Sequence, residues 1–195
     1  MYQQDLAWFK AMLAEQQLID KLKHISLVIT DVDGTLTDGN VIISDHEEDE
    51  LKGISMQDDF IISRALEQGI GLAIITGRRN IAFKKYITEL GVPESLYFEG
   101  IDKDKFKAAV KIKEQLGLSR DDMLMFGDEF LDFEVRNYVS LYAVPLNTPF
   151  YLHPQADIVT PHAGGNGALR ILLDLLLYVQ GKHFAQKYID ELVRT

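Results

Sequence analysis

Continuous apolar runs of four to six residues recur along the chain and are separated by longer mixed segments. Such runs, bounded by glycine or polar residues, are typical of strands buried on both faces of a parallel sheet. They predict three main strands at residues 26–30, 71–76 and 123–126. Shorter runs predict three further strands at residues 96–98, 141–144 and 158–159.

The segments between these runs carry apolar residues at helical spacing. They predict helices at residues 5–22, 59–68, 80–90, 105–116, 133–139 and 167–180. Gly69, Gly91 and Gly117 follow three of these segments, and glycine commonly ends a helix because it adopts the left-handed conformation there. A β-hairpin is predicted around an acidic turn at residues 45–50, with arms at 41–44 and 51–54.

Strands that alternate with helices indicate the α/β class, since parallel strands need crossover connections. We therefore expect a three-layer sandwich with a mainly parallel sheet. No linker or repeat divides the chain, so residues 1–195 are predicted to form one domain, with an N-terminal helical extension at 1–23 and a C-terminal tail at 181–195. The longest apolar stretch, residues 168–179, is too short to span a bilayer, which takes about 20 apolar residues.

Composition narrows the classes of function. The formal net charge of −10 argues against binding to nucleic acid or to an anionic membrane surface, because both need clustered Lys and Arg. The chain has no cysteine, which excludes disulfides and thiolate metal sites. Residues 1–23 carry charges throughout and lack the apolar run of a signal peptide, so a cytoplasmic protein is expected.

Candidate catalytic residues directly follow the three main strands. Asp31 and Asp33 come after the first strand, Thr76 ends the second, and Asp128 and Asp132 come after the third. Ligands of open α/β sheets bind beyond the carboxyl ends of the strands, so these side chains should meet at one edge. Several carboxylates at one place repel each other unless a cation joins them. Oxygen ligands alone favour Mg²⁺.

These residues form a pattern similar to the haloacid dehalogenase superfamily. The run Asp31-Val-Asp-Gly-Thr-Leu-Thr37 resembles its first motif, and Thr76-Gly-Arg78 resembles the second. Lys105 stands where the third motif has a cation, and Gly127-Asp-x-x-x-Asp132 resembles the fourth. The four motifs occur in the order and strand context of the superfamily, which makes the resemblance specific.

The resemblance implies a role for each residue. Asp31 would be the nucleophile that forms an aspartyl-phosphate, and Asp33 the general acid and base. Metal ligands would be the Asp31 and Asp128 carboxylates and the Asp33 backbone carbonyl, while Asp132 would orient the water ligands of the metal. The phosphate would be bound by Thr76, Gly77 and Lys105. Lys103 competes with Lys105 for the cation role, and Lys105 is preferred because an apolar helical stripe begins at Phe106.

The intervals between the motifs are too short to hold an inserted cap domain. A capless family, the 3-deoxy-D-manno-octulosonate 8-phosphate phosphatases, resembles the chain further in its hairpin and in Ala163-Gly-Gly-Asn-Gly-Ala-Leu-Arg170. This resemblance implies a homotetramer, a sugar acid phosphate substrate and a place in lipopolysaccharide biosynthesis. It also makes Arg78, Asp58 and Arg170 candidate substrate contacts. Asp59 and Glu129 depart from the family pattern, which puts sugar recognition and metal geometry in question.

Two alternatives remain open from the sequence. The first is a phosphatase acting on a nine-carbon keto-deoxy sugar acid phosphate, since that sibling family shares nearly all of these features. The second is a non-catalytic binding protein of the same fold. The intact Asp31, Asp33, Thr76 and Asp128 argue against it, because a scaffold does not need them.

Overall fold

The computed structural model describes residues 2–42 and 52–194, and its centre is a parallel sheet. The order of the six strands is β3-β2-β1-β4-β5-β6. Their bounds are β1 Leu27–Thr30, β2 Gly71–Thr76, β3 Tyr97–Glu99, β4 Met123–Phe126, β5 Leu141–Val144 and β6 Ile158–Val159. The predicted α/β class is therefore confirmed, and each predicted strand is present within one residue of its expected ends.

β1 lies in the middle of the sheet, between β2 and β4. Thr30 at its carboxyl end pairs in register with Ile74 of β2 and with Phe126 of β4. The segments that follow β1, β2 and β4 consequently emerge side by side at one edge. This is the juxtaposition that the sequence predicted for the candidate catalytic residues.

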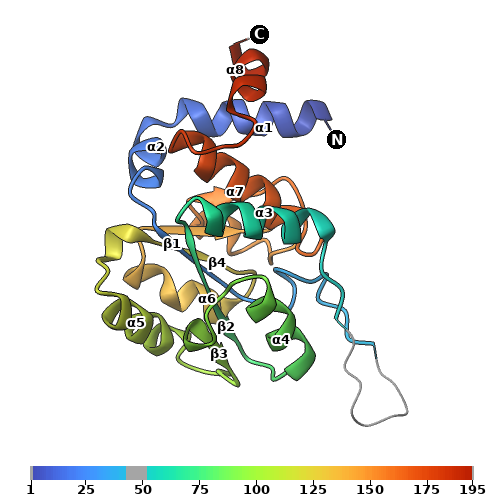
Figure 1. The fold of residues 1–195 in the computed structure, drawn as a ribbon, viewed down its shortest axis with the longest axis vertical. Helices are drawn as coiled ribbons and strands as arrows, with labels where there is room; N and C mark the ends of the chain where they lie inside the picture. The colour runs from blue at the N-terminus through green and yellow to red at the C-terminus, as the bar shows by residue number, and fades with distance from the viewer. Residues whose placement is uncertain (1, 43–51, 195) are drawn as a thin grey trace.

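Helices cover both faces of the sheet (Figure 1). Their bounds are α1 Tyr2–Ala14, α2 Gln16–Leu22, α3 Met56–Glu67, α4 Ile81–Glu89, α5 Lys105–Leu116, α6 Phe130–Phe133, α7 Ala168–Val179 and α8 Gln186–Arg194. Alternate residues of β1 face opposite ways: Val28 packs in a core with α3 and α7, and Ile29 in a second core with α5. The three-layer sandwich is thus confirmed.

Several helix boundaries differ from those predicted. The predicted helix at 5–22 is two helices, because Glu15 adopts φ −88° and ψ 87° and caps α2. α3 begins at Met56, three residues early, since the Ser55 hydroxyl accepts a hydrogen bond from the Gln57 N–H. The predicted helix at 133–139 is instead the short α6 followed by a 3-10 helix, Glu134–Tyr138.

The N-terminal extension and the C-terminal tail pack onto the same domain. The Trp8 indole N–H donates to the Val159 carbonyl of β6 at 2.7 Å, and the Phe9 ring lies 5.4 Å from that of Tyr178. α8 was not predicted; it follows His183, whose Nε2 lies 2.8 Å from the Asp174 carboxylate of α7. The first and last helices, α1 and α8, contact each other above α7 in the view of Figure 1.

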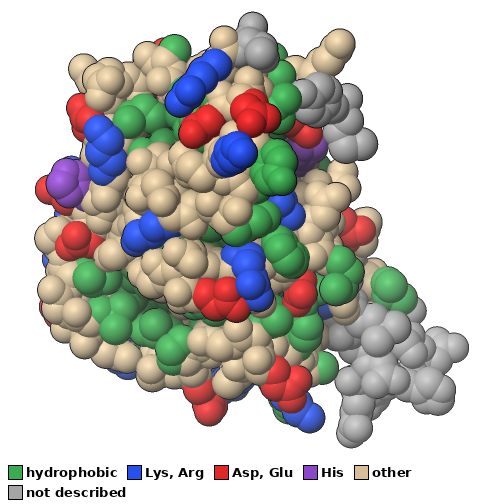
Figure 2. Space-filling view, turned by 45° about the horizontal axis from the view of Figure 1, so that its top comes forward, with side chains coloured by type: hydrophobic (Ala, Val, Ile, Leu, Met, Phe, Trp, Pro, Cys, Tyr) green, Lys and Arg blue, Asp and Glu red, His purple; other side chains and the backbone are tan. Residues whose placement is uncertain are grey.

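The predicted hairpin falls largely on residues 43–51, outside the described residues. Ile42 forms a single β-bridge, and residues 52–54 are not a strand. Within the described ranges, no domain is inserted between β1 and α5, so the chain has no cap there. No helix in those ranges is both long and apolar enough to cross a membrane. Acidic and basic side chains alternate over the face that Figure 2 shows, with hydrophobic ones between them.

Candidate active site

Asp31 is held rigidly at the end of β1. Its backbone N–H donates to the Phe126 carbonyl at 3.0 Å, so the pairing with β4 extends one residue past the strand. Its side chain is buried, with 5% of the residue exposed. The chain then turns tightly, because the N–H groups of Leu36 and Thr37 both donate to the Val32 carbonyl, at 2.9 and 3.0 Å. We call residues 32–38, which follow the candidate nucleophile Asp31, the nucleophile loop.

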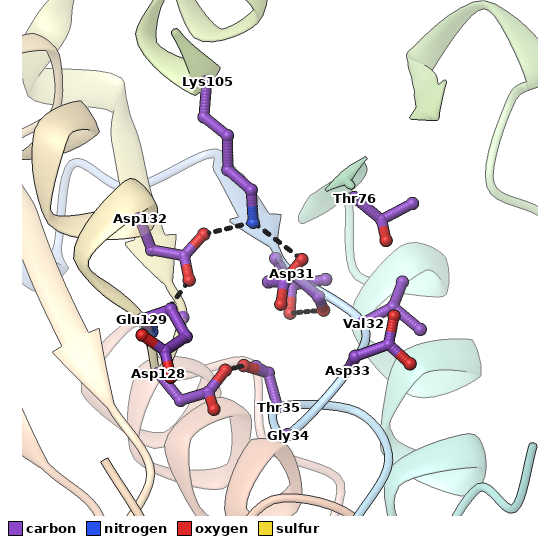
Figure 3. A network of polar contacts seen from close by, with 12 residues as sticks. Asp31, Val32, Asp33, Gly34, Thr35, Thr76, Lys105, Asp128, Glu129 and Asp132 are labelled. Carbon is purple, nitrogen blue, oxygen red and sulfur yellow. Dashed lines mark hydrogen bonds and ion pairs between the residues drawn. The ribbon is translucent and has the colours of Figure 1, made fainter. Parts of the chain in front are cut away.

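Lys105 brings a buried positive charge to Asp31. It is the first residue of α5, it is 4% exposed, and its Nζ donates to Asp31 Oδ1 at 2.8 Å and to Asp132 Oδ1 at 2.7 Å. Figure 3 shows the amine between the two carboxylates. Lys103 is exposed, so the structure brings Lys105, the preferred of the two candidates, to Asp31.

Three carboxylates converge at this edge of the sheet. Oxygens of Asp31, Asp128 and Asp132 all lie within 4.8 Å of one another. Asp128 Oδ1 accepts from the Thr35 hydroxyl at 2.8 Å, and Asp132 Oδ2 accepts from the Glu129 N–H at 3.0 Å (Figure 3). Glu129 stands where the family pattern has Asp, but it makes this contact through its backbone N–H. The difference in side chain therefore leaves the contact intact. The set of hard oxygen donors fits a divalent cation.

The electrostatics of the cluster favour an added cation. Burial, followed by the neighbouring charge of Asp132, raises the pKa of Asp31 to about 7. Burial also raises the pKa of Asp128 to about 6 and raises that of Asp132. Burial alone would lower the pKa of the Lys105 amine, but the Asp132 and Asp31 carboxylates together raise it. One ammonium therefore faces three carboxylates, and a divalent ion would compensate the excess negative charge.

Asp33 and Thr76 lie on the side of Asp31 that faces away from Asp132 (Figure 3). The carboxylate of Asp33 points away from Asp128 (Figure 3) and pairs with Lys52, whose side chain is 6% exposed. Thr76 is buried, and its hydroxyl accepts from the Arg78 N–H at 3.3 Å, which leaves its own proton available to donate. Gly77 and Arg78 follow on the exposed rim.

Asp58 and Arg170 are two of the predicted substrate contacts. Asp58 forms hydrogen bonds to the start of α7, and Arg170 belongs to the first turn of that helix. The Asp58 carboxylate is fully buried and accepts from the Gly167 N–H at 3.2 Å and from the Arg170 N–H at 2.7 Å. The Arg170 side chain donates to Asp174 at 2.7 Å, with its guanidinium 5.3 Å from the centre of the Phe60 ring. These contacts give Asp58 a structural task, because it caps the free N–H groups at the start of α7.

Several contacts at the site were not foreseen from the sequence, among them those of Thr35 and Asn147. Thr35 was recognised as part of the first motif but was given no role, although it holds Asp128. Asn147, after β5, had no signal at all; its amide bridges the Gly34 carbonyl and the Gly164 N–H, at 2.8 and 2.7 Å. No local sequence pattern identifies a side chain that bonds the backbone of distant segments.

Known proteins resemble this chain in both sequence and fold. A family model described as haloacid dehalogenase-like hydrolase matches residues 28–101. The 3-deoxy-D-manno-octulosonate 8-phosphate phosphatase KdsC of Escherichia coli strain K12 is 36% identical over 85% of this chain and 86% of its own length. The crystal structure of that phosphatase from Moraxella catarrhalis, in complex with magnesium, phosphate and KDO, is 30% identical and superposes with a TM-score of 0.81 over 91% of this chain and 98% of that one. A cobalt-bound phosphatase from Haemophilus influenzae is 29% identical, with a TM-score of 0.79 over 88% and 99%.

Proposed function

Because this chain belongs to the 3-deoxy-D-manno-octulosonate 8-phosphate phosphatase family of haloacid dehalogenase-like hydrolases, we propose that it hydrolyses that eight-carbon sugar acid phosphate. Membership makes it a phosphatase, and the KDO-bound relative supports a sugar acid phosphate as its substrate class. The observation that carries the proposal is the buried contact of Lys105 with Asp31, at 2.8 Å, inside the carboxylate cluster. Buried charge clusters with shifted pKa values concentrate at functional sites, which favours an enzyme over a scaffold.

In the first step, an Asp31 oxygen attacks the phosphorus and the bond from phosphorus to the sugar oxygen breaks. The leaving oxygen takes the bonding electrons and receives a proton from Asp33, while the phosphoryl group remains on Asp31 as an aspartyl-phosphate. Lys105 and the Thr76 hydroxyl lie beside Asp31 and would stabilise the negative charge on the phosphoryl oxygens.

In the second step, Asp33 takes a proton from a water molecule, and the water oxygen bonds to phosphorus. The bond from phosphorus to Asp31 then breaks, which releases inorganic phosphate and returns the Asp31 carboxylate. The exposure of the Asp33 side chain, 26%, supports this role, because the leaving sugar oxygen and the incoming water would both reach it from solvent.

We propose Mg²⁺ as the metal of the cluster. Asp31 and Asp128 would hold it with their carboxylates and Asp33 with its backbone carbonyl, while Asp132 would orient its water ligands. A bound Mg²⁺ would supply positive charge to the phosphoryl oxygens and lower the repulsion between them and Asp31.

Affinity for Mg²⁺ should rise with pH. In the metal-free chain the pKa values of Asp31 and Asp128 are about 7 and about 6, so below these values protons occupy the ligands and must be displaced. Between pH 8 and pH 5.5 we expect the affinity to fall, by up to about tenfold per pH unit for each proton displaced. Calorimetry in buffers of different ionisation enthalpy would measure the protons released; binding without proton release at pH 6 would contradict this expectation.

A panel of phosphorylated sugar acids tests the substrate. With Mg²⁺ present, we expect kcat/KM for the eight-carbon 3-deoxy-D-manno-octulosonate 8-phosphate to exceed that for nine-carbon keto-deoxy analogues. A preference for a nine-carbon analogue would mean that the chain has the activity of the sibling family of nine-carbon sugar acid phosphatases. Activity on simple aryl phosphates alone would remove the sugar acid from the proposal.

We also propose that the enzyme works as a homotetramer. Exposed large apolar side chains occur in the segments after β1, β2 and β5, namely Met56, Ile81 and Phe150. A contact between subunits would bury such side chains. Light scattering should give a mass about four times the 22.1 kDa of one chain, and a monomer at micromolar concentration would exclude this assembly.

A further inference from the structure

The backbone of the nucleophile loop is held from outside by two segments distant in the sequence. Asn147, in the segment after β5, donates from Nδ2 to the Gly34 carbonyl at 2.8 Å. The oxygen of the same amide accepts from the Gly164 N–H at 2.7 Å. The next residue, Gly165, donates its N–H to the Thr35 carbonyl at 3.2 Å. One side-chain amide thus connects the nucleophile loop with the glycine-rich turn before α7.

The two backbones are in close contact at this point. A Cβ on Gly164 would lie 1.9 Å from the Gly34 carbonyl oxygen, and one on Gly165 would lie 2.4 Å from the Asp38 nitrogen. Gly34 itself has φ +83°, and a Cβ there would lie 2.2 Å from Asp128 Oδ2. The Gly34 peptide is therefore enclosed between the glycine-rich turn and Asp128, a candidate metal ligand. A small rotation of this peptide would displace Asp128 within the carboxylate cluster.

We propose that Asn147 is a positioning residue for phosphoryl transfer, acting through Thr35 on Asp128. Its amide fixes the peptide between Gly34 and Thr35, and that peptide sets the direction of the Thr35 hydroxyl, which donates to Asp128 Oδ1 at 2.8 Å. Asn suits the position because one amide carries both the donor and the acceptor that the two backbones need. The proposal rests on the phosphatase function described above.

Substitution of Asn147 gives a clean test, because the residue is exposed and its removal opens no core cavity. For Asn147→Ala we expect kcat to fall about tenfold and Mg²⁺ affinity, measured by calorimetry without substrate, to weaken about tenfold, as for other residues that orient metal ligands. KM for the sugar acid phosphate should stay within about twofold, since the hydrogen bonds of Asn147 go to the backbone of Gly34 and Gly164 and not to Asp31 or Thr76. Asn147→Asp keeps the acceptor for Gly164 but loses the donor to Gly34, so it should be impaired as strongly.

Gln180→Ala is the matched control. The Gln180 amide also bonds two backbone groups, the carbonyls of Leu22 and Ile25, at 2.9 and 2.7 Å, but these precede β1, at the opposite end of the strand from the nucleophile loop. Loss of the Gln180 amide should lower thermal stability as much as the loss of the Asn147 amide does. It should leave kcat and Mg²⁺ affinity unchanged. Wild-type kcat and metal affinity in Asn147→Asp would overturn the proposal, as would equal losses in Gln180→Ala. If wild type does not turn over the sugar acid phosphate, the substrate proposal fails, while calorimetry still decides the role of Asn147.

Discussion

Replacing Asp31 by Asn should abolish turnover without unfolding the protein. An amide cannot form the aspartyl-phosphate, so we expect kcat for phosphate release to fall on the order of 10⁴-fold. The fold should tolerate the change, because Asn occupies the same volume and the Asp31 N–H still pairs with the Phe126 carbonyl. Phosphate release and thermal melting, measured on the same preparation, check both parts.

The stability of this variant should even exceed that of wild type in metal-free solution at pH 8. Burial raises the pKa of Asp31 from 3.8 to about 7 in the folded chain. A group whose pKa is raised on folding loses its stabilising contribution as pH rises through the folded value, so the penalty on wild type grows between about pH 4 and pH 7 and is present in full at pH 8. Asn does not ionise and escapes this penalty. Added Mg²⁺ should stabilise wild type and reverse the order.

Asp38→Asn provides the matched control for this experiment. Asp38 belongs to the nucleophile loop, but its exposed carboxylate accepts hydrogen bonds from Asn40 and not from the cluster. The same chemical change at this position should leave turnover within about twofold, since it neither contacts Lys105 nor bonds phosphorus. If Asp31→Asn retained wild-type turnover, the aspartyl-phosphate mechanism would be wrong.

The sheet and its catalytic edge could be predicted from the sequence because both depend on local features. The strands are continuous apolar runs, and Asp31, Thr76 and Asp128 lie at the strand ends or within two residues of them. Parallel topology then brings these residues together, and the registers of β1 with β2 and β4 do so here. The prediction needed only periodicity and the rule that ligands bind beyond the carboxyl ends of the strands.

The features that could not be predicted from the sequence depend on contacts between residues distant along the chain. The spacing of apolar residues carries no information about such contacts. Asp58 was expected to contact the substrate, and the structure adds that its carboxylate caps α7, more than a hundred positions away along the chain. α8 was not predicted, and its apolar Ile189 and Val193 are explained only by their packing on the core that α1 and α7 also form. Asp132 was expected to orient water, and the structure adds its direct bond to Lys105.

Replacing Lys105 by Met should damage both stability and catalysis. Lys105 is the cation that the Asp31 and Asp132 carboxylates share, at 2.8 and 2.7 Å, and all three residues are buried. Breaking a buried ion pair by removing one partner costs about 3–5 kcal/mol, because the remaining charge has no compensation. Turnover should fall about 10²–10³-fold, since the negative charge of the phosphoryl group loses a fixed positive partner.

A second substitution separates the two effects of Lys105. Adding Asp132→Asn to Lys105→Met removes one of the uncompensated charges, so much of the lost stability should return in chemical denaturation at pH 7.5. Turnover should stay low in the double variant, because no cation faces the phosphoryl group there. Lys103→Met, which removes an exposed positive charge two residues away, should change neither quantity. Full recovery of turnover by Asp132→Asn would mean that Lys105 only balances charge in the resting protein and takes no part in binding phosphate.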